Sequence, residues 1–138
     1  MAGKSSVETY FNCLLLLKLV IRTGQGIVTQ DFLDECNKKV KNWSDEEKNA
    51  FIHDIENIMK GIIQAMENDV IVSSDEVQEL MNRHYHWLTL TWTPNKESYL
   101  GLTELYQTPE FRKCFDTRHP QLLSYIIEAM KIYAKNKL

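Results

Sequence analysis

Apolar residues recur at steps of three and four along most of the chain, a spacing that predicts helices rather than strands. The clearest stripe lies in residues 45–68 and consists of Phe51, Ile55, Ile58, Met59, Ile62 and Met66. Ser44 and Glu47 precede it at the spacing of a capping box, in which both side chains satisfy backbone N–H groups that lack helical partners. The pattern therefore predicts a helix over residues 45–68.

Further stripes predict four shorter helices in the second half of the chain. Residues 73–76 (SSDE) form a second capping-box pattern. The helix that it begins carries on its inner face Val77, Leu80, Met81, His84 and Leu88. A turn at Pro94 separates this helix from one over residues 96–106. The Thr108-Pro109 and His119-Pro120 pairs begin the last two, because a proline in the first turn loses no helical hydrogen bond.

The first 43 residues have a less regular pattern, with helices predicted at 6–22 and 29–41. The apolar run at 10–21 is too short to span a bilayer, which needs about 20 apolar residues, and Asn12 and Lys18 interrupt it. It also lacks the flanks of a signal peptide. We therefore expect no membrane partner, and we divide the chain into an N-terminal helical segment, 1–43, and a core, 44–138.

Length and composition favour one ordinary globular domain. The chain has 138 residues, of which 43% are hydrophobic and 25% charged, and its net charge is −3. Such a charge gives no overall positive field, so direct nucleic-acid binding is not expected. The three cysteines are odd in number and far apart, and none forms a C-x-x-C pair. This usage favours free thiols in a reducing cytoplasm.

No motif for catalysis, a metal or a cofactor is evident. His84 and His86 are two residues apart, and on a helix such side chains point about 200° away from each other. The sequence has no H-E-x-x-H, no Cys/His cluster, no nucleophile elbow and no glycine-rich phosphate loop. We therefore predict a protein that is not an enzyme and binds no metal or cofactor.

Aromatic residues gather near the C-terminal end. The last 54 residues contain Tyr85, Trp87, Trp92, Tyr99, Tyr106, Phe111, Phe115, Tyr125 and Tyr133. Tyrosine and tryptophan combine a large apolar surface with a polar atom, which suits a cavity that orients a ligand. The same residues could equally form a solid aromatic core, and the sequence leaves open which of them face a cleft.

The order of several segments resembles the TipAS antibiotic-recognition domain, which occurs in drug-sensing MerR-type regulators and in albicidin resistance proteins. These segments are 77–80 (VQEL), 84–88 (HYHWL), 97–106 (ESYLGLTELY), 108–112 (TPEFR) and the amphipathic stretch 122–133. The resemblance implies an all-α, single globin-like domain of about six to seven helices with a ligand cleft. It also implies that the segment 1–43 closes over a bound drug as a lid.

The resemblance leads to a functional hypothesis of non-covalent binding and sequestration of bulky thiopeptide- or albicidin-like antibiotics. The expected ligand-binding residues are His84, Trp87, Trp92, Tyr99, Leu102, Glu104, Tyr106 and Phe111. Thiopeptide-sensing relatives trap the drug on a cysteine in the helix that matches residues 97–106. Gly101 occupies that position here, so covalent capture is not expected.

Two alternatives stay open. The chain could be a protein-interaction module, acting as the detached effector domain of a MerR-type transcriptional regulator, with a homodimer formed through the apolar helix at 10–21. It could instead be an enzyme that modifies the drug, although no catalytic motif supports this. Oligomeric state and drug mass after incubation distinguish these alternatives from simple binding.

Overall fold

The computed structural model describes residues 38–39, 41–90 and 93–138. These residues contain five complete helices and no strand: α3 (Asp45–Glu67), α4 (Asp75–Leu88), α5 (Lys96–Tyr106), α6 (Pro109–Asp116) and α7 (Leu122–Lys137). The all-α prediction is thus confirmed for this part of the chain. The helix predicted at 6–22, and all but the last residues of the one predicted at 29–41, lie outside the described residues.

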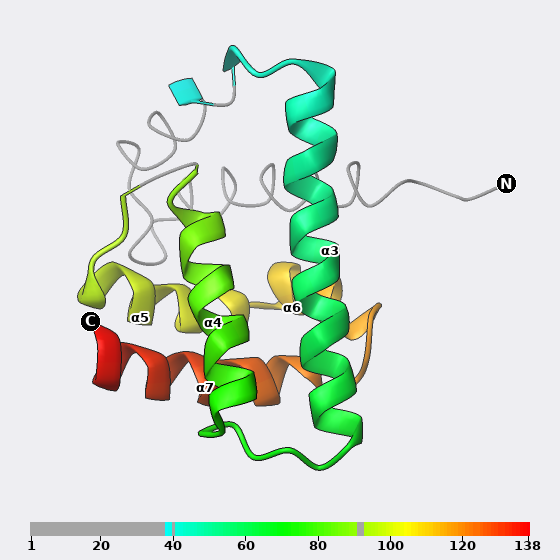
Figure 1. Cartoon of the computed structure of the whole chain (residues 1–138), viewed down its shortest axis with the longest axis vertical. Coiled ribbons are helices and arrows are strands. Elements are labelled where there is room, and N and C mark those ends of the chain that lie inside the picture. Colours follow the sequence, from blue (N-terminus) through cyan, green and yellow to red (C-terminus); the bar gives the residue numbers. More distant parts are fainter. Residues whose placement is uncertain (1–37, 40, 91–92) are drawn as a thin grey trace, which may run out of the picture.

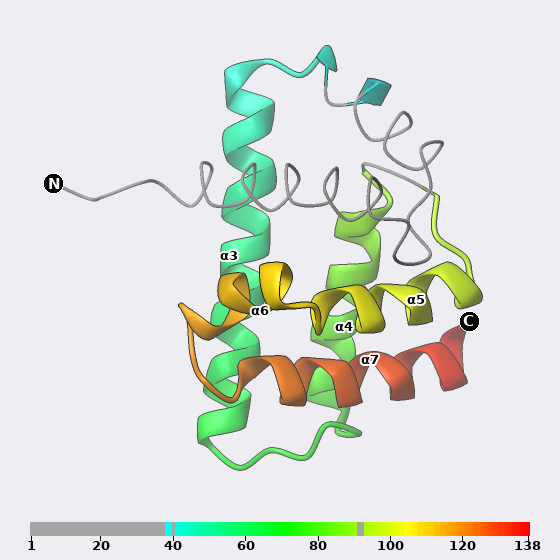
Figure 2. The same cartoon turned by 180° about the vertical axis from the view of Figure 1, so that it is seen from behind.

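The five helices form two layers (Figure 1). Helices α3 and α4 run antiparallel as one pair, and α5 and α7 run antiparallel as a second pair that crosses the first. Figure 2 shows α6 beside the α5–α7 pair, on the face opposite to that seen in Figure 1. The C-terminal end of α7 lies next to the start of α5 in both views. The core fills the space between the two layers.

Helix α3 begins and ends close to the predicted bounds. The Glu47 backbone N–H donates to the Ser44 hydroxyl oxygen at 3.1 Å, and the Ser44 N–H donates to the Glu47 carboxylate at 3.2 Å. The predicted capping box is therefore confirmed. The apolar stripe turns inward as expected, and Ile58 and Ile62 are almost completely buried. Propensity and capping thus agree with tertiary burial along this helix.

Helix α4 begins one residue later than the second capping-box pattern predicts. Its cap is Ser74, whose hydroxyl accepts from the Val77 N–H at 3.2 Å. The predicted cap at Ser73, with Glu76 reaching back to it, is therefore wrong. The Ser74 N–H donates to the Ile71 carbonyl at 3.1 Å, so Ser73 lies within a turn that precedes the helix. This turn decides which of the two adjacent serines caps the helix.

This one-residue shift gives a direct stability test. We expect Ser74→Ala to lower the free energy of unfolding by about 1 kcal/mol, because the cap bond to the Val77 N–H is lost. Ser73→Ala is the matched control and should change it by less than about 0.5 kcal/mol, since Ser73 is exposed. Urea unfolding followed by circular dichroism measures both. A larger effect at Ser73 than at Ser74 would contradict the observed helix start.

The last three helices follow the predicted order with small differences at their starts. Asn95 and Ser98 form a capping box at α5. Thr108 precedes α6, but its hydroxyl donates to the Leu105 carbonyl at 2.7 Å and makes no cap bond. Helix α7 begins at Leu122, two residues after Pro120. Its predicted inner face is confirmed as buried: Leu122, Leu123, Ile126, Ile127, Met130 and Tyr133.

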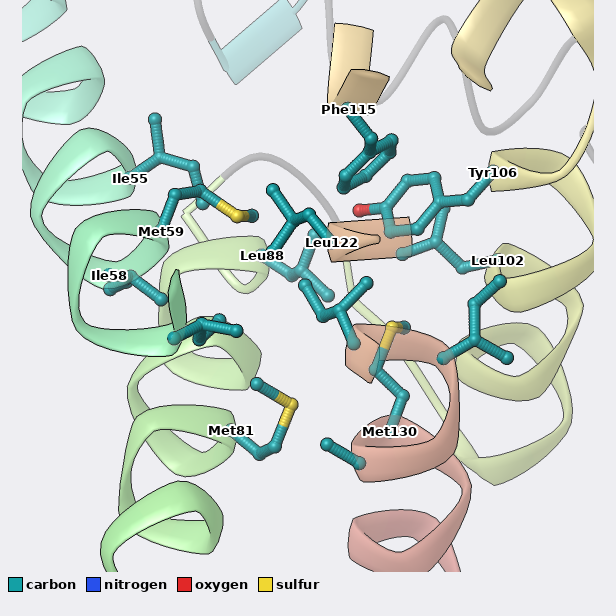
Figure 3. Packing of buried hydrophobic residues seen from close by; sticks show 14 of the residues in the cluster. Ile55, Ile58, Met59, Met81, Leu88, Leu102, Tyr106, Phe115, Leu122 and Met130 are labelled. Atoms are coloured by element: carbon teal, nitrogen blue, oxygen red, sulfur yellow. The ribbon is translucent and has the colours of Figure 1, made fainter. Parts of the chain in front are cut away.

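Side chains from both layers interlock in the core (Figure 3). Met81 of α4 and Met130 of α7 enter the interior from opposite sides of the boundary between the layers. Hydrogen bonds also cross this boundary. The Tyr125 hydroxyl donates to the Val70 carbonyl at 2.6 Å, and the Gln78 side chain donates to the Val72 and Ala129 carbonyls.

Among the described helices, none combines the length and apolar character needed to cross a bilayer.

Candidate functional site

His84 lies at the centre of a group of aromatic rings. Helix α4 places its side chain on the buried face, and the residue is completely buried. Its imidazole centroid lies 6.2 Å from that of Trp87, 6.2 Å from that of Tyr99 and 6.5 Å from that of Tyr106. Two turns of α5 supply the tyrosines, so α4 and α5 together surround the histidine.

The rings continue on both sides of His84. On the α3 side, Trp87 stacks on Phe51 with centroids 4.3 Å apart, and its indole N–H donates to the Phe51 carbonyl at 2.8 Å. Trp43 meets Phe51 edge-on at 4.9 Å. On the α6 side, the centroid of Tyr106 lies 4.8 Å from that of Phe115 and 6.1 Å from that of Phe111. We call this set the aromatic band: Trp43, Phe51, Trp87, His84, Tyr99, Tyr106, Phe111 and Phe115.

Two buried polar atoms in the aromatic band have no hydrogen-bond partner among the described residues: Nδ1 of His84 and the hydroxyl of Tyr99. The other imidazole nitrogen of His84, Nε2, lies 3.5 Å from the Tyr106 hydroxyl, at the long end of hydrogen-bond distances. An unpaired buried polar group destabilises a fold by about 1–3 kcal/mol, so native proteins keep few of them. Such atoms often mark a place where function requires a polar group.

The site is electrically neutral near pH 7. Burial lowers the pKa of His84 from 6.5 to about 4, so its imidazole carries no charge at that pH. Burial also raises the pKa of Tyr99 and that of Tyr106, and both remain phenols. A site of this kind offers flat apolar faces and neutral hydrogen-bonding atoms, and it favours uncharged, ring-rich molecules over ions.

The structure brings most of the predicted ligand-binding residues together. The residues His84, Trp87, Tyr99 and Tyr106 form the centre of the aromatic band, and Phe111 lies at one end. Leu102 is buried beside them, and Figure 3 shows it next to Tyr106 on α5. Glu104 is exposed on α5, and Trp92 lies outside the described residues. Which of these side chains contact a ligand stays a prediction.

Three members of the aromatic band are not among the site residues predicted from the sequence. Phe51 belongs to the predicted apolar stripe of α3, and the structure shows that it also stacks on Trp87. Trp43 lies just before the helix cap, and Phe115 lies one turn after Phe111 on α6. A helical periodicity identifies buried positions, but it carries no information on which helices meet. Only the tertiary arrangement places α3 and α6 on either side of His84.

The two histidines of α4 diverge as predicted: His84 is buried, while His86 is exposed and its Nδ1 lies 2.8 Å from the Asn82 carbonyl. Among the described residues, no group of three or more His, Cys, Asp or Glu could hold a metal ion.

The prediction of free thiols is wrong for Cys114, which is disulfide-bonded. The spacing of cysteines along a chain does not reveal which of them the fold brings together.

Comparison with known proteins identifies the kind of domain to which this site belongs. Residues 28–133 match the TipAS antibiotic-recognition domain. This chain belongs to the TipAS family. TipAS domains are globin-like ligand-binding domains of a non-enzymatic family, and the prediction that the protein is not an enzyme is thereby confirmed. No solved structure shows significant similarity to the chain.

Among characterised proteins, the TipAS chain is similar to the HTH-type transcriptional regulator SkgA of two Caulobacter vibrioides strains, NA1000/CB15N and ATCC 19089/CB 15. Each is 26% identical over 120 residues, which cover 80% of this chain and 47% of the regulator. The chain therefore spans about half the length of the curated relatives that it matches.

Proposed function

We propose that this protein binds a bulky, largely apolar, antibiotic-like molecule at the aromatic band and sequesters it without covalent attachment. The observation that carries the proposal is a pair of buried polar atoms that have no hydrogen-bond partner in the described part of the chain, His84 Nδ1 and the Tyr99 hydroxyl, set among aromatic rings. Thiopeptide- and albicidin-like compounds combine flat heterocycles with neutral hydrogen-bonding groups, and this chemistry matches the site.

Each predicted residue then has a physical role. The rings of Trp87, Tyr99 and Tyr106 stack on the ligand, and His84 supplies a polar contact. Leu102, Phe111 and Trp92 add apolar lining. Glu104, being exposed, contacts the part of the ligand that stays nearest to solvent. Burial of flat apolar surface at roughly 25 cal/mol per Å² supports micromolar or tighter binding after association costs.

Two further observations favour reversible capture. Gly101 occupies the position at which thiopeptide-sensing relatives carry a reactive cysteine, and it is buried in α5. Cys114, on the neighbouring helix α6, is disulfide-bonded and has no thiolate to offer a drug. The mass of a recovered drug should therefore equal the mass added, and a mass change on incubation would favour a drug-modifying enzyme instead.

A second candidate function follows from the similarity to a transcriptional regulator. The domain could act as a drug-sensing effector module that pairs with a regulator or with itself, and light scattering of the full chain and of a variant lacking residues 1–26 tests this. Dissociation of a stable oligomer on deletion would support it. In either case the proposed location is the cytoplasm, the compartment in which DNA-binding relatives of this kind act, and direct contact with nucleic acid is not part of the proposal.

We expect calorimetric titration of the full chain with albicidin or thiostrepton to give micromolar or tighter binding to one of them, with quenching of tryptophan fluorescence. His84→Leu should weaken that binding roughly tenfold or more, because the polar contact between the imidazole and the ligand is lost. His86→Leu, an exposed change on the same helix, is the matched control and should bind like the wild type. Equal binding by both variants, or no binding of either drug at high micromolar concentration, would overturn the proposal.

A further inference from the structure

We propose that Tyr106 fixes the tautomer of His84, so that the proton lies on Nδ1 and the site selects neutral ligands that present a hydrogen-bond acceptor. The selected class is heteroaromatic rings with an unprotonated ring nitrogen, or amide carbonyls held between rings. This inference rests on the proposed function, since it concerns the chemistry of the same site. Tyr106 is a positioning residue, because it acts on the ligand through His84.

Within the described residues, Tyr106 is the one side chain that lies within hydrogen-bond distance of the His84 imidazole. The Tyr106 hydroxyl lies 3.5 Å from Nε2 of His84, and no other hydrogen bond of that hydroxyl exists within the described residues. Figure 3 shows the Tyr106 hydroxyl pointing away from α5 into the interior, beside Phe115. Two further rings flank His84 among the described residues, those of Trp87 and Tyr99, and neither carries a charge that would hold a second proton on the imidazole.

A count of unpaired groups distinguishes the two neutral tautomers. If Nε2 carries the proton, it donates to the Tyr106 oxygen, and both the Tyr106 O–H and the Nδ1 lone pair are left without partners. If Nδ1 carries the proton, the Tyr106 O–H donates to Nε2, and the Nδ1–H is the one group of this pair that lacks a partner. Because each unpaired buried group is destabilising, the Nδ1–H form is favoured. The lowered pKa of His84 supports a neutral ring in either case.

The favoured tautomer determines what the site accepts. A buried N–H that lacks a partner rejects a ligand that offers only donors or only hydrocarbon at that point, because the N–H then stays unsatisfied. An acceptor atom in the plane of the imidazole satisfies it. A cation at the same place would lie buried with no counter-charge, which is more unfavourable still. The Tyr99 hydroxyl, which both donates and accepts, adapts to the neighbouring ligand atom.

The tautomer can be measured without any ligand. Nitrogen-15 spectra of the histidine rings in the labelled full chain, with His84 assigned by His84→Gln, should show a protonated Nδ1 and an unprotonated Nε2. Tyr106→Phe should abolish this single form. Tyr133→Phe is the matched control and should retain it, because the Tyr133 hydroxyl donates to Asn82 at 2.9 Å rather than to His84. A wild-type ring protonated on Nε2, or a spectrum unchanged by Tyr106→Phe, would overturn the inference.

The ligand preference can be measured with three probes of the same shape: naphthalene, quinoline and N-methylquinolinium. Quinoline offers a ring nitrogen as acceptor, naphthalene has none, and the third compound is a cation with the nitrogen blocked. We expect quinoline to bind roughly three- to tenfold more tightly than naphthalene, as expected for one hydrogen bond, and the cation to bind most weakly. Tyr106→Phe should reduce the preference for quinoline, and Tyr133→Phe should not.

The outcomes separate this inference from the proposed function. Equal binding of quinoline and naphthalene would overturn the acceptor preference while leaving drug binding intact. Failure of all three probes, with albicidin or thiostrepton still bound, would also overturn it, because the site would then not accept heteroaromatic rings at His84. Failure of every probe and both drugs would overturn the proposed function itself, while the nitrogen-15 spectra would still report the tautomer.

Discussion

Between pH 6.5 and pH 4 the free energy of unfolding should fall by about 3 kcal/mol on account of His84 alone. The histidine of the unfolded chain takes up a proton as the pH falls through its ordinary pKa of 6.5, whereas burial keeps the folded ring neutral until about pH 4. In this window the unfolded state binds more protons than the folded state, so stability decreases as the pH falls. Urea unfolding at half-unit pH steps measures the slope.

The matched variants for this prediction lie on the same helix. His84→Gln removes the titrating ring and should flatten the pH dependence in this window, whatever its effect on stability at pH 7. His86→Gln removes an exposed histidine and should keep the wild-type slope. A wild-type slope that persists in His84→Gln would assign the acid sensitivity to other groups, and it would contradict a neutral, solvent-excluded imidazole at the centre of the aromatic band.

Local sequence patterns predict the described helices well, because for some of them two independent signals, the capping pattern and the apolar stripe, indicate the same helix. In α3 the capping box at Ser44 and the apolar stripe through Ile58 and Ile62 indicate the same start and the same inner face. At α4 two adjacent serines both match the cap pattern, and the turn closed by the Ser74 N–H and the Ile71 carbonyl decides between them. Capping patterns alone place this helix start only to within one residue.

The candidate site was predictable only in part. The density of tryptophan, tyrosine and histidine after residue 84 points to α4 and α5, because these residue types are uncommon together on two short helices. The stack of Phe51 on Trp87 was not predictable, since it depends on the crossing of α3 and α4. The sequence also could not predict that the Nδ1 of His84 and the hydroxyl of Tyr99 lack a hydrogen-bond partner among the residues that the structure describes, because this depends on several helices at once.

Trp87 illustrates both what the sequence predicts and what only the tertiary structure shows. Its position on α4 follows from the sequence, but its neighbours connect α3 to the histidine: Phe51 lies on one side at 4.3 Å between centroids, and His84 lies on the other at 6.2 Å. Its indole N–H also donates to a carbonyl of α3. Trp87 therefore contributes to the stability of the fold and to the shape of the site, and its substitution tests both.

Trp87→Ala should lower the free energy of unfolding by about 3–5 kcal/mol, because a large buried ring, its stacking on Phe51 and its hydrogen bond are lost together. Trp87→Phe retains a ring for the stack and loses the N–H donor, so we expect a loss of about 1–2 kcal/mol. Trp43→Ala is the control at the half-buried end of the aromatic band and should be less damaging than Trp87→Ala. Urea unfolding followed by circular dichroism, which does not depend on indole fluorescence, gives all three values. If Trp87→Ala were no worse than Trp43→Ala, the contact of α3 with α4 through this ring would not be a principal support of the site.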